Sequence, residues 1–453
     1  MPDKKASADV GRLSGNFFTC VRGSVPVEIT DLLEKAAVCA DKYGFTAYAV
    51  GGFVRDLLAG RKMGRKSLDV DIAIEGDGIE FARRFTNQYG GKLKTHKRFK
   101  TAIVMLKGSR KIDVATARTE IYTEPAALPI VEMSSIKNDL YRRDFTINAM
   151  AVKLNGDNKN QLIDFFGGQQ DLKDGALRIL HDRSFVEDPT RLFRAIRFEQ
   201  RFNFAIEANT KKFLKLAATG DLIDKISGAR LFNELNVIFS NEEHPSNAMQ
   251  RMREFGLWKL IYPHLMYDKK IHRLCRQAEE AIAWHKLSFD TERIRPWFIY
   301  LLCLSSALDE PQSVEFFKRL GFDRHPVKRI IEARRKAADC IDITGSLTPA
   351  MSVEIYEALN GLSADVMLAV MAASGERQGK KVVAEFMSRL RYITPRVKGG
   401  DLIRAGIESG PLMGRVMRAL QMEVIKNTLP TKEDEIRFSK NFYRLLKESA
   451  GNI

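Results

Sequence analysis

Hydrophobic periodicity changes once along this 453-residue chain, and that change limits the folds open to it. From Tyr48 to about Val152, short runs rich in β-branched residues alternate with helical stretches, which is typical of a mixed α/β domain. After Asp171 nearly every segment has helical spacing, interrupted by turn signals. The sequence therefore predicts a small α/β head followed by an all-α neck, body and tail.

The same pattern divides the chain into four expected segments. They are a polar leader (1–25), the α/β head (26–168), a helical neck (169–240) and a helical body and tail (241–453). The leader lacks the apolar core of a signal peptide. The longest apolar stretch, Trp297–Leu304, is far shorter than a bilayer requires, so no membrane partner is expected.

Charge and cysteine usage narrow the expected partners and compartment. Lys and Arg number 73 against 57 Asp and Glu, giving a net charge of +16. Such an excess favours a polyanion, because neutralising phosphates releases condensed counterions, although it also fits a merely soluble basic protein. None of the five cysteines forms a CxxC pair or a zinc-type cluster. Free thiols suit a reducing compartment, so we expect a cytoplasmic location.

Two acidic residues alternate with apolar ones in the segment "LDVDIAI". In a β-strand this spacing places Asp69 and Asp71 on one face and the apolar residues on the other. Carboxylates about 7 Å apart along a strand repel each other unless a cation lies between them. The pair predicts a divalent metal site, and Mg²⁺ prefers such oxygen ligands. A solvent-exposed edge strand is the alternative explanation.

A third carboxylate, Asp113, lies in another short strand, "KIDVAT". If that strand neighbours the first, the three carboxylates form a site for two metal ions. Read alone, Asp113 is more typical of a surface aspartate.

A Gly-Gly turn follows the run "AYAV". Gly51 and Gly52 end a predicted strand and begin a predicted helix, with Arg55 in its first turn. Glycine allows backbone to approach a bound group closely, and helix N-termini favour anions. The turn is a candidate triphosphate cradle but not a Walker loop, because no GK[ST] follows. A purely structural turn is the alternative.

Four polar residues recur at three-residue spacing in the segment "EDPTRLFRAIRF". On a helix, Asp188, Arg191, Arg194 and Arg197 would form a slowly winding stripe. Aspartate only accepts hydrogen bonds, whereas arginine donates them from a planar fork. Together they match the amino group and adjacent ring nitrogen that adenine and cytosine share, and they mismatch uracil and guanine. A solvated arginine-rich helix face is the alternative.

These motifs, taken in order, carry a family resemblance. The chain resembles the class II tRNA nucleotidyltransferases and bacterial poly(A) polymerases, within the DNA polymerase beta superfamily. The likeness continues through "RRDFTINAMA" (Arg142–Ala151) and "FVEDPTRLFRAIRFEQRF" (Phe185–Phe202). It implies a DNA polymerase beta-like head and template-independent addition of the 3′-terminal CCA, or its terminal A, to tRNA from CTP and ATP.

The resemblance implies a role for each matching residue. Asp69 and Asp71 match the ligands of Mg²⁺, and Asp113 matches a third catalytic carboxylate that is Glu in many members. The remaining matches are nucleotide-binding positions: Gly51, Gly52, Arg55, Arg143, Asp188, Arg191, Arg194 and Arg197. No protein partner is implied.

Residues 117–145, between Asp113 and the end of the RRD motif, contain two prolines and no clear periodicity. They are similar to the flexible loop of this family, which is associated with adenine addition, so the segment argues against an enzyme that adds only C. Basic helices such as "KRIIEARRK" in the body suit a tRNA backbone, although each alone is typical of a solvated face.

Two other functions stay open at this point. A poly(A) polymerase would share the same head, but the chain lacks a long basic extension after Tyr443. A non-catalytic RNA-binding relative would need a degraded metal site, whereas Asp69, Asp71 and Asp113 are all present.

Overall fold

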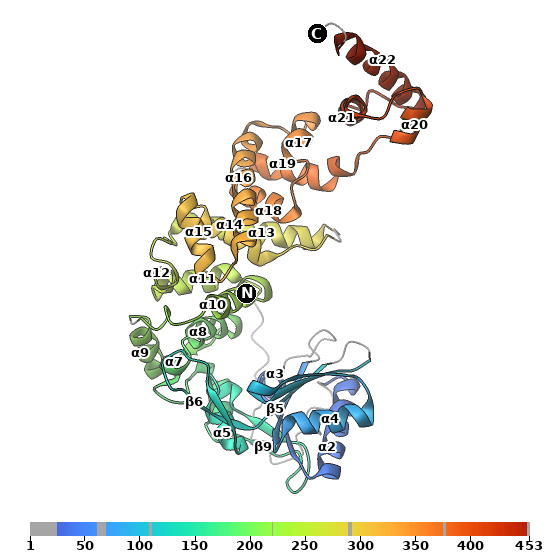
Figure 1. The fold of residues 1–453 in the computed structure, drawn as a ribbon. Coiled ribbons are helices and arrows are strands. Elements are labelled where there is room, and N and C mark those ends of the chain that lie inside the picture. Colours follow the sequence, from blue (N-terminus) through green and yellow to red (C-terminus); the bar gives the residue numbers. More distant parts are fainter. Residues whose placement is uncertain are drawn as a thin grey trace. The chain divides into compact units, whose positions relative to one another are not determined.

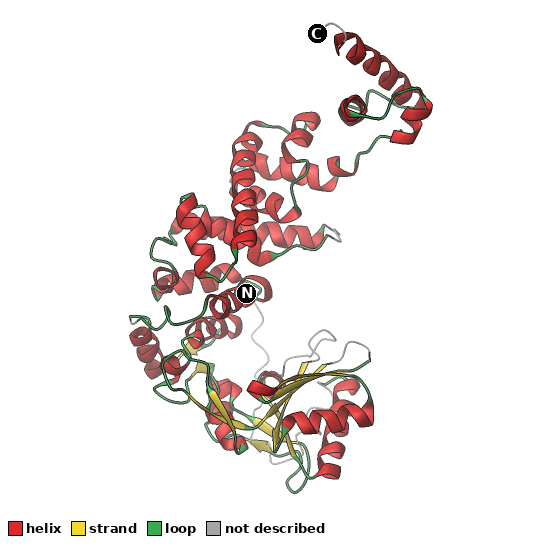
Figure 2. Ribbon diagram, in the orientation of Figure 1, coloured by secondary structure: helices red, strands yellow, loops and turns green. Residues whose placement is uncertain are grey.

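The structure, a computed structural model, describes residues 25–60, 69–107, 111–219, 221–288, 292–374 and 377–450. Nearly all of the predicted leader lies outside these ranges. The chain divides into two compact units, Met1–Glu234 with Glu254–Leu260 and Leu235–Arg253 with Ile261–Ile453. Among the described residues, all strands lie in the first unit and the second unit contains helices only, as the colours of Figure 2 show.

The first unit contains a seven-stranded sheet in the order β3-β4-β5-β2-β1-β8-β9. Only β2 and β5 run parallel, and the other neighbours are antiparallel. The strands are β1 (Thr46–Val50), β2 (Asp69–Glu75), β3 (Lys92–His96), β4 (Thr101–Met105), β5 (Lys111–Thr116), β8 (Ala151–Lys153) and β9 (Leu162–Ile163). The sheet places two strands that are distant in sequence, β2 and β5, side by side.

Helices α2 (Val27–Tyr43) and α4 (Gly78–Tyr89) pack on one face of this sheet (Figure 1). Alternate residues of β2, Val70 and Ile72, are buried in the core beneath these helices. Because side chains alternate between the two faces of a strand, Asp71 is on the opposite face. The apolar alternation of the sequence thus sets which sheet face carries the carboxylate.

The opposite face is only partly covered. Ala73 of β2 packs there in a smaller apolar cluster with Ile136 and Leu140 of α5 (Ile136–Tyr141). Two residues earlier along the strand, Asp71 is half-buried and lines a cavity. The carboxylate face is therefore closed at one end by α5 and open at the other.

Residues 117–145, in which the sequence showed no periodicity, contain regular structure. Strands β6 (Arg118–Ile121) and β7 (Ile130–Met133) form an antiparallel hairpin, and α5 follows it. The connecting residues 122–129 include Ala126, which is buried and has a φ of 64°. The segment is thus a hairpin with an ordered tip.

The neck departs slightly from the all-α prediction. Two short strands, β10 (Ala176–Leu177) and β11 (Ala205–Ile206), pair in parallel. The other elements of the first unit are the helices α3 (Gly52–Leu58), α6 (Gly168–Asp174), α7 (Ser184–Glu187), α8 (Thr190–Phe202), α9 (Ala208–Ala217), α10 (Gly228–Asn241, which continues into the second unit) and α12 (Leu257–Ile261), and the 3-10 turns η1 (Lys97–Phe99) and η2 (Thr146–Asn148).

The second unit is helical throughout its described residues. Its elements are α11 (Pro245–Glu254), α13 (Lys269–Leu287), α14 (Pro296–Ser305), α15 (Glu310–Arg319), α16 (Arg324–Ser346), α17 (Ser352–Leu359), α18 (Ala364–Ala373), α19 (Arg377–Ser388), η3 (Leu390–Tyr392), α20 (Gly399–Arg404), α21 (Pro411–Ile425) and α22 (Lys432–Ala450). Among the helices described, no single one has the length and apolar character to cross a membrane; α17 and α18 pass that test only as a pair bent by 117°.

Candidate active site

Two carboxylates meet where β2 and β5 run in parallel. The strand register places Asp71 directly opposite Asp113, and Asp69 opposite Lys111. Lys111 Nζ lies 2.6 Å from Asp113 Oδ2, so the lysine partly neutralises this group. Asp71 and Asp113 line one cavity of about 300 Å³ together with Arg143 and His96. The strand that carries Asp113 is therefore the neighbour of the strand that carries Asp71, as a site with several carboxylates requires.

The turn after β1 brings backbone against this carboxylate. Gly51 has a φ of 72°, and a Cβ there would lie 2.9 Å from Arg143 Nη1 and 3.5 Å from Asp71 Oδ2. A residue with a side chain would thus be strained and would fill the space beside the carboxylate.

The donor set suits a hard divalent cation, although part of it lies outside the described side chains. Carboxylate oxygens such as those of Asp71 and Asp113 are the ligands that Mg²⁺ prefers. The side chain of Asp69, the other predicted ligand, is not among those described. Within the described residues no group of three or more His, Cys, Asp or Glu could hold a metal ion. The paired carboxylates and the glycine-lined space beside them fit a metal site to which Asp69 would add a third carboxylate.

Arg55, on α3, is anchored at the base of a second, larger cavity. It is only 5% exposed, its Nη1 donates to Asn148 Oδ1 at 2.6 Å, and its Nε donates to Asp56 at 2.9 Å. The guanidinium also lies over the Phe202 ring, 4.5 Å from its centroid. Burial lowers the pKa of Arg55, and the neighbouring Asp56 offsets part of that effect. These contacts hold the side chain in one orientation.

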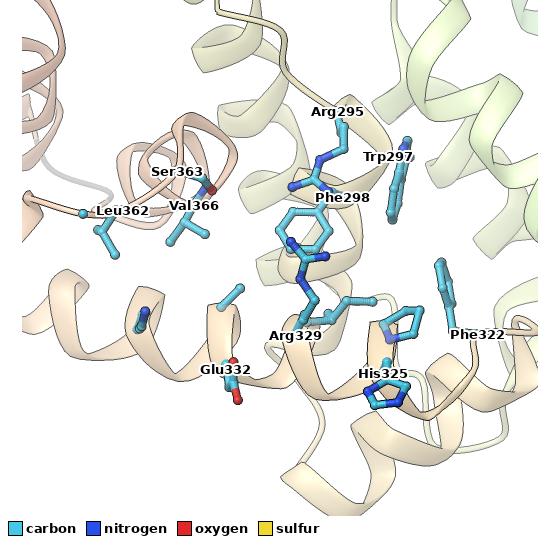
Figure 3. A pocket seen from close by; sticks show the side chains of 15 residues that line it. Arg295, Trp297, Phe298, Phe322, His325, Arg329, Glu332, Leu362, Ser363 and Val366 are labelled. Carbon is cyan, nitrogen blue, oxygen red and sulfur yellow. The ribbon is translucent and has the colours of Figure 1, made fainter.

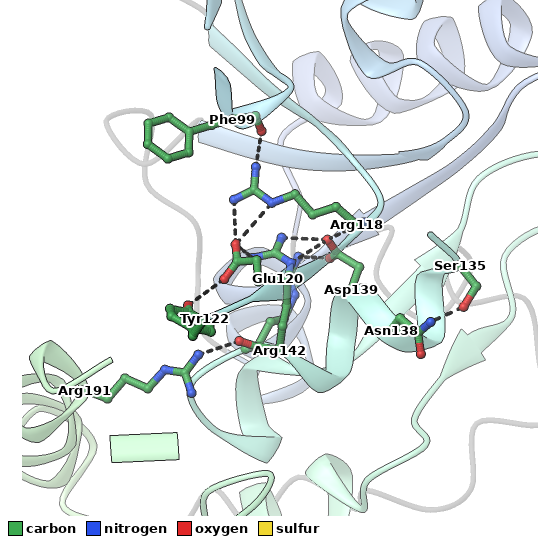
Figure 4. Close-up of polar contacts among 10 residues, drawn as sticks. Phe99, Arg118, Glu120, Tyr122, Ser135, Asn138, Asp139, Arg142 and Arg191 are labelled. Carbon is green, nitrogen blue, oxygen red and sulfur yellow. Dashed lines mark hydrogen bonds and ion pairs between the residues drawn. The ribbon is translucent and has the colours of Figure 1, made fainter. Parts of the chain in front are cut away.

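A buried ion-pair network supports the RRD motif (Figure 4). Asp139, with no exposed side-chain surface, accepts hydrogen bonds from Arg142 at 2.6 Å and Arg143 at 3.0 Å. Burial raises the pKa of Asp139, but the two guanidinium groups outweigh it, and the net pKa is lowered. Glu120 of the hairpin accepts hydrogen bonds from Arg142 and Tyr122, at 2.9 and 2.8 Å. The network connects α5 and the hairpin to Arg143, the arginine that lies beside Asp71.

Asp144, the acidic member of the RRD motif, pairs with the neck helix. Arg194 donates to Asp144 Oδ2 through Nε at 2.9 Å and Nη2 at 2.6 Å. The other carboxylate oxygen accepts hydrogen bonds from Asn148 and from the Phe145 N–H. Burial raises the pKa of Asp144, but Arg194 and Asn148 outweigh it and hold that pKa well below its usual range. Arg194, predicted to contact nucleotide, is thus engaged by the head.

The predicted stripe of four polar residues on one helix is wrong at its first position. Asp188 lies in extended conformation between α7 and α8, with φ −134° and ψ 92°, and α8 begins at Thr190. The residue before a proline is disfavoured in helical conformation, and Pro189 follows Asp188. Asp188 therefore precedes the helix that carries Arg191, and its Oδ1 accepts a hydrogen bond from the Thr190 N–H.

Arg191 lies next to Asp188 and is held by acceptors from two elements. Its Nη1 donates to Ser184 O and Oγ, at 3.2 and 2.7 Å, and its Nη2 donates to Arg142 O at 2.6 Å. An arginine has five N–H donors, so two have no acceptor among the described residues. Figure 4 shows Arg191 reaching from the neck towards the hairpin network.

Most of the predicted site residues share one cavity of about 540 Å³. Those that line it are Gly51, Gly52, Arg55, Asp71, Arg143, Asp188, Arg191, Arg194 and Arg197. Asp113 does not line this cavity but lines the 300 Å³ cavity, which shares Asp71 and Arg143 with it. Other lining residues were not predicted: Glu120, Tyr122, Arg142, Asp144, Asn148, Thr190, Phe198, Arg201 and Glu234. Asp144 is the one that the RRD motif could have indicated.

A separate cavity of about 680 Å³ lies within the helical unit (Figure 3). Trp297 and Phe322 stack on one side of it, with centroids 5.8 Å apart. Arg295 donates to Asp365 through Nε and Nη2, at 2.8 and 2.7 Å, and packs over Phe298. Since Asp365 is buried in α18 and Arg295 precedes α14, this ion pair fastens two packed helices.

Two protein-family models match parts of this chain. The family model for the Poly A polymerase head domain matches residues 47–178. A second model, for the probable RNA and SrmB-binding site of polymerase A, matches residues 203–269. The solved structure of a CCA-adding enzyme, apo form II, superposes with a TM-score of 0.78 and 34% identity, covering 97% of this chain and 99% of that one.

The chain belongs to the class II tRNA nucleotidyltransferase family. This confirms the resemblance seen in the motifs and the predicted α/β head with a mostly helical remainder. The family implies a divalent metal ion. Thermotoga maritima CCA-adding enzyme, solved in complex with tRNA, is another structural neighbour, with a TM-score of 0.75 and 32% identity over 94% of this chain and 98% of that one.

Curated relatives carry related names. The A-adding tRNA nucleotidyltransferase of Geobacter sulfurreducens is 38% identical over 92% of this chain, and that of Aquifex aeolicus is 33% identical over 84%. The chain spans about half the length of these two relatives, 47% and 45% respectively.

Proposed function

We propose that this chain is a template-independent tRNA nucleotidyltransferase that adds the 3′-terminal CCA, or its terminal A, from CTP and ATP with release of pyrophosphate. One observation carries the proposal. Asp71, which lies opposite Asp113 on the neighbouring strand, lines the same cavity as Asp188 and Arg191. The proposed metal-binding pair thus adjoins the proposed base-reading pair. The names of the two relatives and the tRNA complex of the Thermotoga maritima enzyme support tRNA as the substrate.

The proposed reaction is in-line attack by the RNA 3′ hydroxyl on the α-phosphorus, with pyrophosphate leaving. Asp69, Asp71 and Asp113 would hold Mg²⁺, which supplies Lewis-acid stabilisation of the charge that develops on the phosphoryl oxygens. Arg143 lies beside Asp71, and its buried Nε has no hydrogen-bond acceptor among the described residues. The Arg143 guanidinium lines the cavity together with Gly51, Gly52 and the fixed Arg55, and these groups are proposed to bind the triphosphate.

Base selection is assigned to the pair at the start of α8. Among the described residues, one carboxylate oxygen of Asp188 has no donor and could accept from an amino group, and Arg191 has two N–H donors without an acceptor that could reach a ring nitrogen. Adenine and cytosine present both groups side by side, whereas uracil and guanine place a carbonyl where the amino group would be. A mismatched base would leave buried polar groups unpaired, which costs about 1–3 kcal/mol for each group. Arg194 and Arg197 complete the same wall of the cavity.

The direct test supplies three tRNA substrates, ending before CCA, ending in CC, or mature, each with ATP or CTP alone. Addition of A to the CC end by ATP is the expected result. Addition of C to the shorter end would extend the assignment from A-adding to CCA-adding. No incorporation into any of the three would refute the proposal.

A point substitution tests the assigned site. Asp71→Ala is expected to abolish transfer, because it removes a proposed metal ligand, while tRNA binding measured by gel shift stays within about twofold. Glu80→Ala, on the surface of α4, is the matched control and should retain full activity. Unchanged turnover in Asp71→Ala would remove the mechanism.

A poly(A) polymerase is the second candidate, because the matched head model bears that name. It would extend RNAs other than tRNA with long tails from ATP alone. Tail length on a non-tRNA transcript distinguishes the two: a single added residue or none supports the tRNA enzyme, and long tails support the polymerase.

A further inference from the structure

Arg230, at the start of α10, contacts two parts of the site at once. Its Nη2 donates to Asp188 Oδ1 at 2.8 Å, and its Nη1 donates to the Ala126 carbonyl at 2.9 Å. Asp188 is the proposed base-reading carboxylate, and Ala126 lies in the tip of the β6–β7 hairpin. One guanidinium therefore joins the hairpin tip to the residue that would read the base.

The contacts on Asp188 fall on one oxygen only. Oδ1 accepts hydrogen bonds from the Thr190 N–H at 3.0 Å, from Thr190 Oγ1 at 2.5 Å and from Arg230. Within the described residues Oδ2 accepts none, and Asp188 lines the 540 Å³ cavity. Three donors on one oxygen fix the rotation of the carboxylate and leave the other oxygen for a ligand.

The hairpin tip is itself held in an unusual conformation. Ala126 has a φ of 64°, which is uncommon for a residue with a side chain, and its N–H donates to Val186 O at 3.4 Å. Since Val186 belongs to α7, immediately before Asp188, the tip touches the neck at two places. The planar fork of Arg230 makes its two hydrogen bonds interdependent, because both nitrogens move with the same plane.

We propose that Arg230 is a positioning residue for base selection, which holds Asp188 so that Oδ2 faces the incoming base only while the hairpin tip is docked. The proposal rests on the function proposed above. Without Arg230, Asp188 keeps only the two donors of Thr190 and can exchange its oxygens. It would then accept a hydrogen bond from an amino group in a less defined direction, and discrimination against bases with a carbonyl there would weaken.

The test measures the ratio of kcat/KM for ATP to that for GTP on a tRNA ending in CC. In Arg230→Ala this ratio is expected to fall about tenfold, as one charge-assisted hydrogen bond that orders the reading group is lost. Arg230→Lys should recover part of the ratio, because a single ammonium can reach Asp188 but cannot replace the fork. Arg83→Ala, which removes a surface ion pair with Glu80, is the matched arginine control and should keep the wild-type ratio.

A second readout follows the tether itself. Amide exchange in residues 122–129 should quicken in Arg230→Ala and stay unchanged in Arg83→Ala. A purely structural role would lower the active fraction equally for both nucleotides and leave the ATP:GTP ratio unmoved.

A ratio within twofold of wild type in Arg230→Ala would overturn the inference while leaving the proposed function in place. Failure of the wild-type protein to add any nucleotide to any tRNA would instead overturn the proposed function, so the two failures are distinguishable.

Discussion

Replacing Asp144 by alanine tests whether the head and the start of the neck are held together by one buried ion pair. The carboxylate is 8% exposed and accepts two hydrogen bonds from Arg194. Removing one partner of a buried pair costs about 3–5 kcal/mol, because the other charge is left uncompensated. The Arg194 side chain keeps 33% of its surface exposed and can regain water, so the low end, about 3 kcal/mol, applies. For a unit of this size that corresponds to a Tm lower by roughly 6–12 °C.

Differential scanning calorimetry of the full chain measures this shift, with two variants to isolate the pair. Glu80→Ala loses contacts to two surface arginines and should cost no more than about 1 kcal/mol. Adding Arg194→Met to Asp144→Ala should restore much of the loss, since removing both charges leaves none unpaired. A Tm loss in Asp144→Ala no larger than in Glu80→Ala, or no recovery in the double variant, would refute the reasoning.

Three further outcomes are expected. Gly51→Ala should lower kcat at least tenfold, since the new Cβ would lie 2.9 Å from Arg143 Nη1. Gly60→Ala is the control, because Gly60 has a similar φ of 66° but open space around it, and this variant should keep its activity. Equal activity in the two variants would contradict this prediction. The lowered pKa values of Asp139 and Asp144 stabilise the folded state above about pH 4, and this stabilisation is lost as the pH falls towards the folded pKa values. The free energy of unfolding, measured with urea, should therefore drop between about pH 5 and pH 3. In Asp144→Asn the drop should be less steep. EDTA should abolish transfer and added Mg²⁺ restore it; transfer that persists in EDTA would exclude a divalent requirement.

The alternating segments could be assigned from sequence because their patterns are local. The apolar residues of β2 alternate with carboxylates, and the Gly-Gly turn marks the end of β1, so both elements were predicted near their observed bounds. Strand β3 was not predicted, because its lysine-rich, largely exposed sequence carries no apolar alternation. The hairpin β6–β7 was missed because its two four-residue strands show no clear periodicity and because it is held by partners outside itself, such as Arg142 and Arg230.

Most of the candidate site residues line one cavity, but the contacts among them could not be predicted from the sequence. The cavity does gather the glycines, Asp71 and the arginines of α8. Helical spacing alone could not show that Pro189 displaces Asp188 from the helix, or that Arg194 turns towards Asp144. Nor could it reveal Arg230, which is 42 residues from Asp188. Interactions between distant segments depend on tertiary packing, which spacing along the chain does not encode.

The order of strands in the sheet has a consequence for how this head can vary. After β2 the chain forms α4, β3 and β4 and then returns as β5, which pairs with β2. Strands β3 and β4 therefore lie at one edge of the sheet, beyond β5. Length changes in the turns between β2 and β5 need not disturb the pairing of Asp71 with Asp113. A single residue inserted inside β5 between Lys111 and Asp113 would instead rotate the second carboxylate into the apolar interior. Peptide tags or reporter loops are therefore best placed in the exposed turn between α4 and β3, and kept out of the strands that bear the acids.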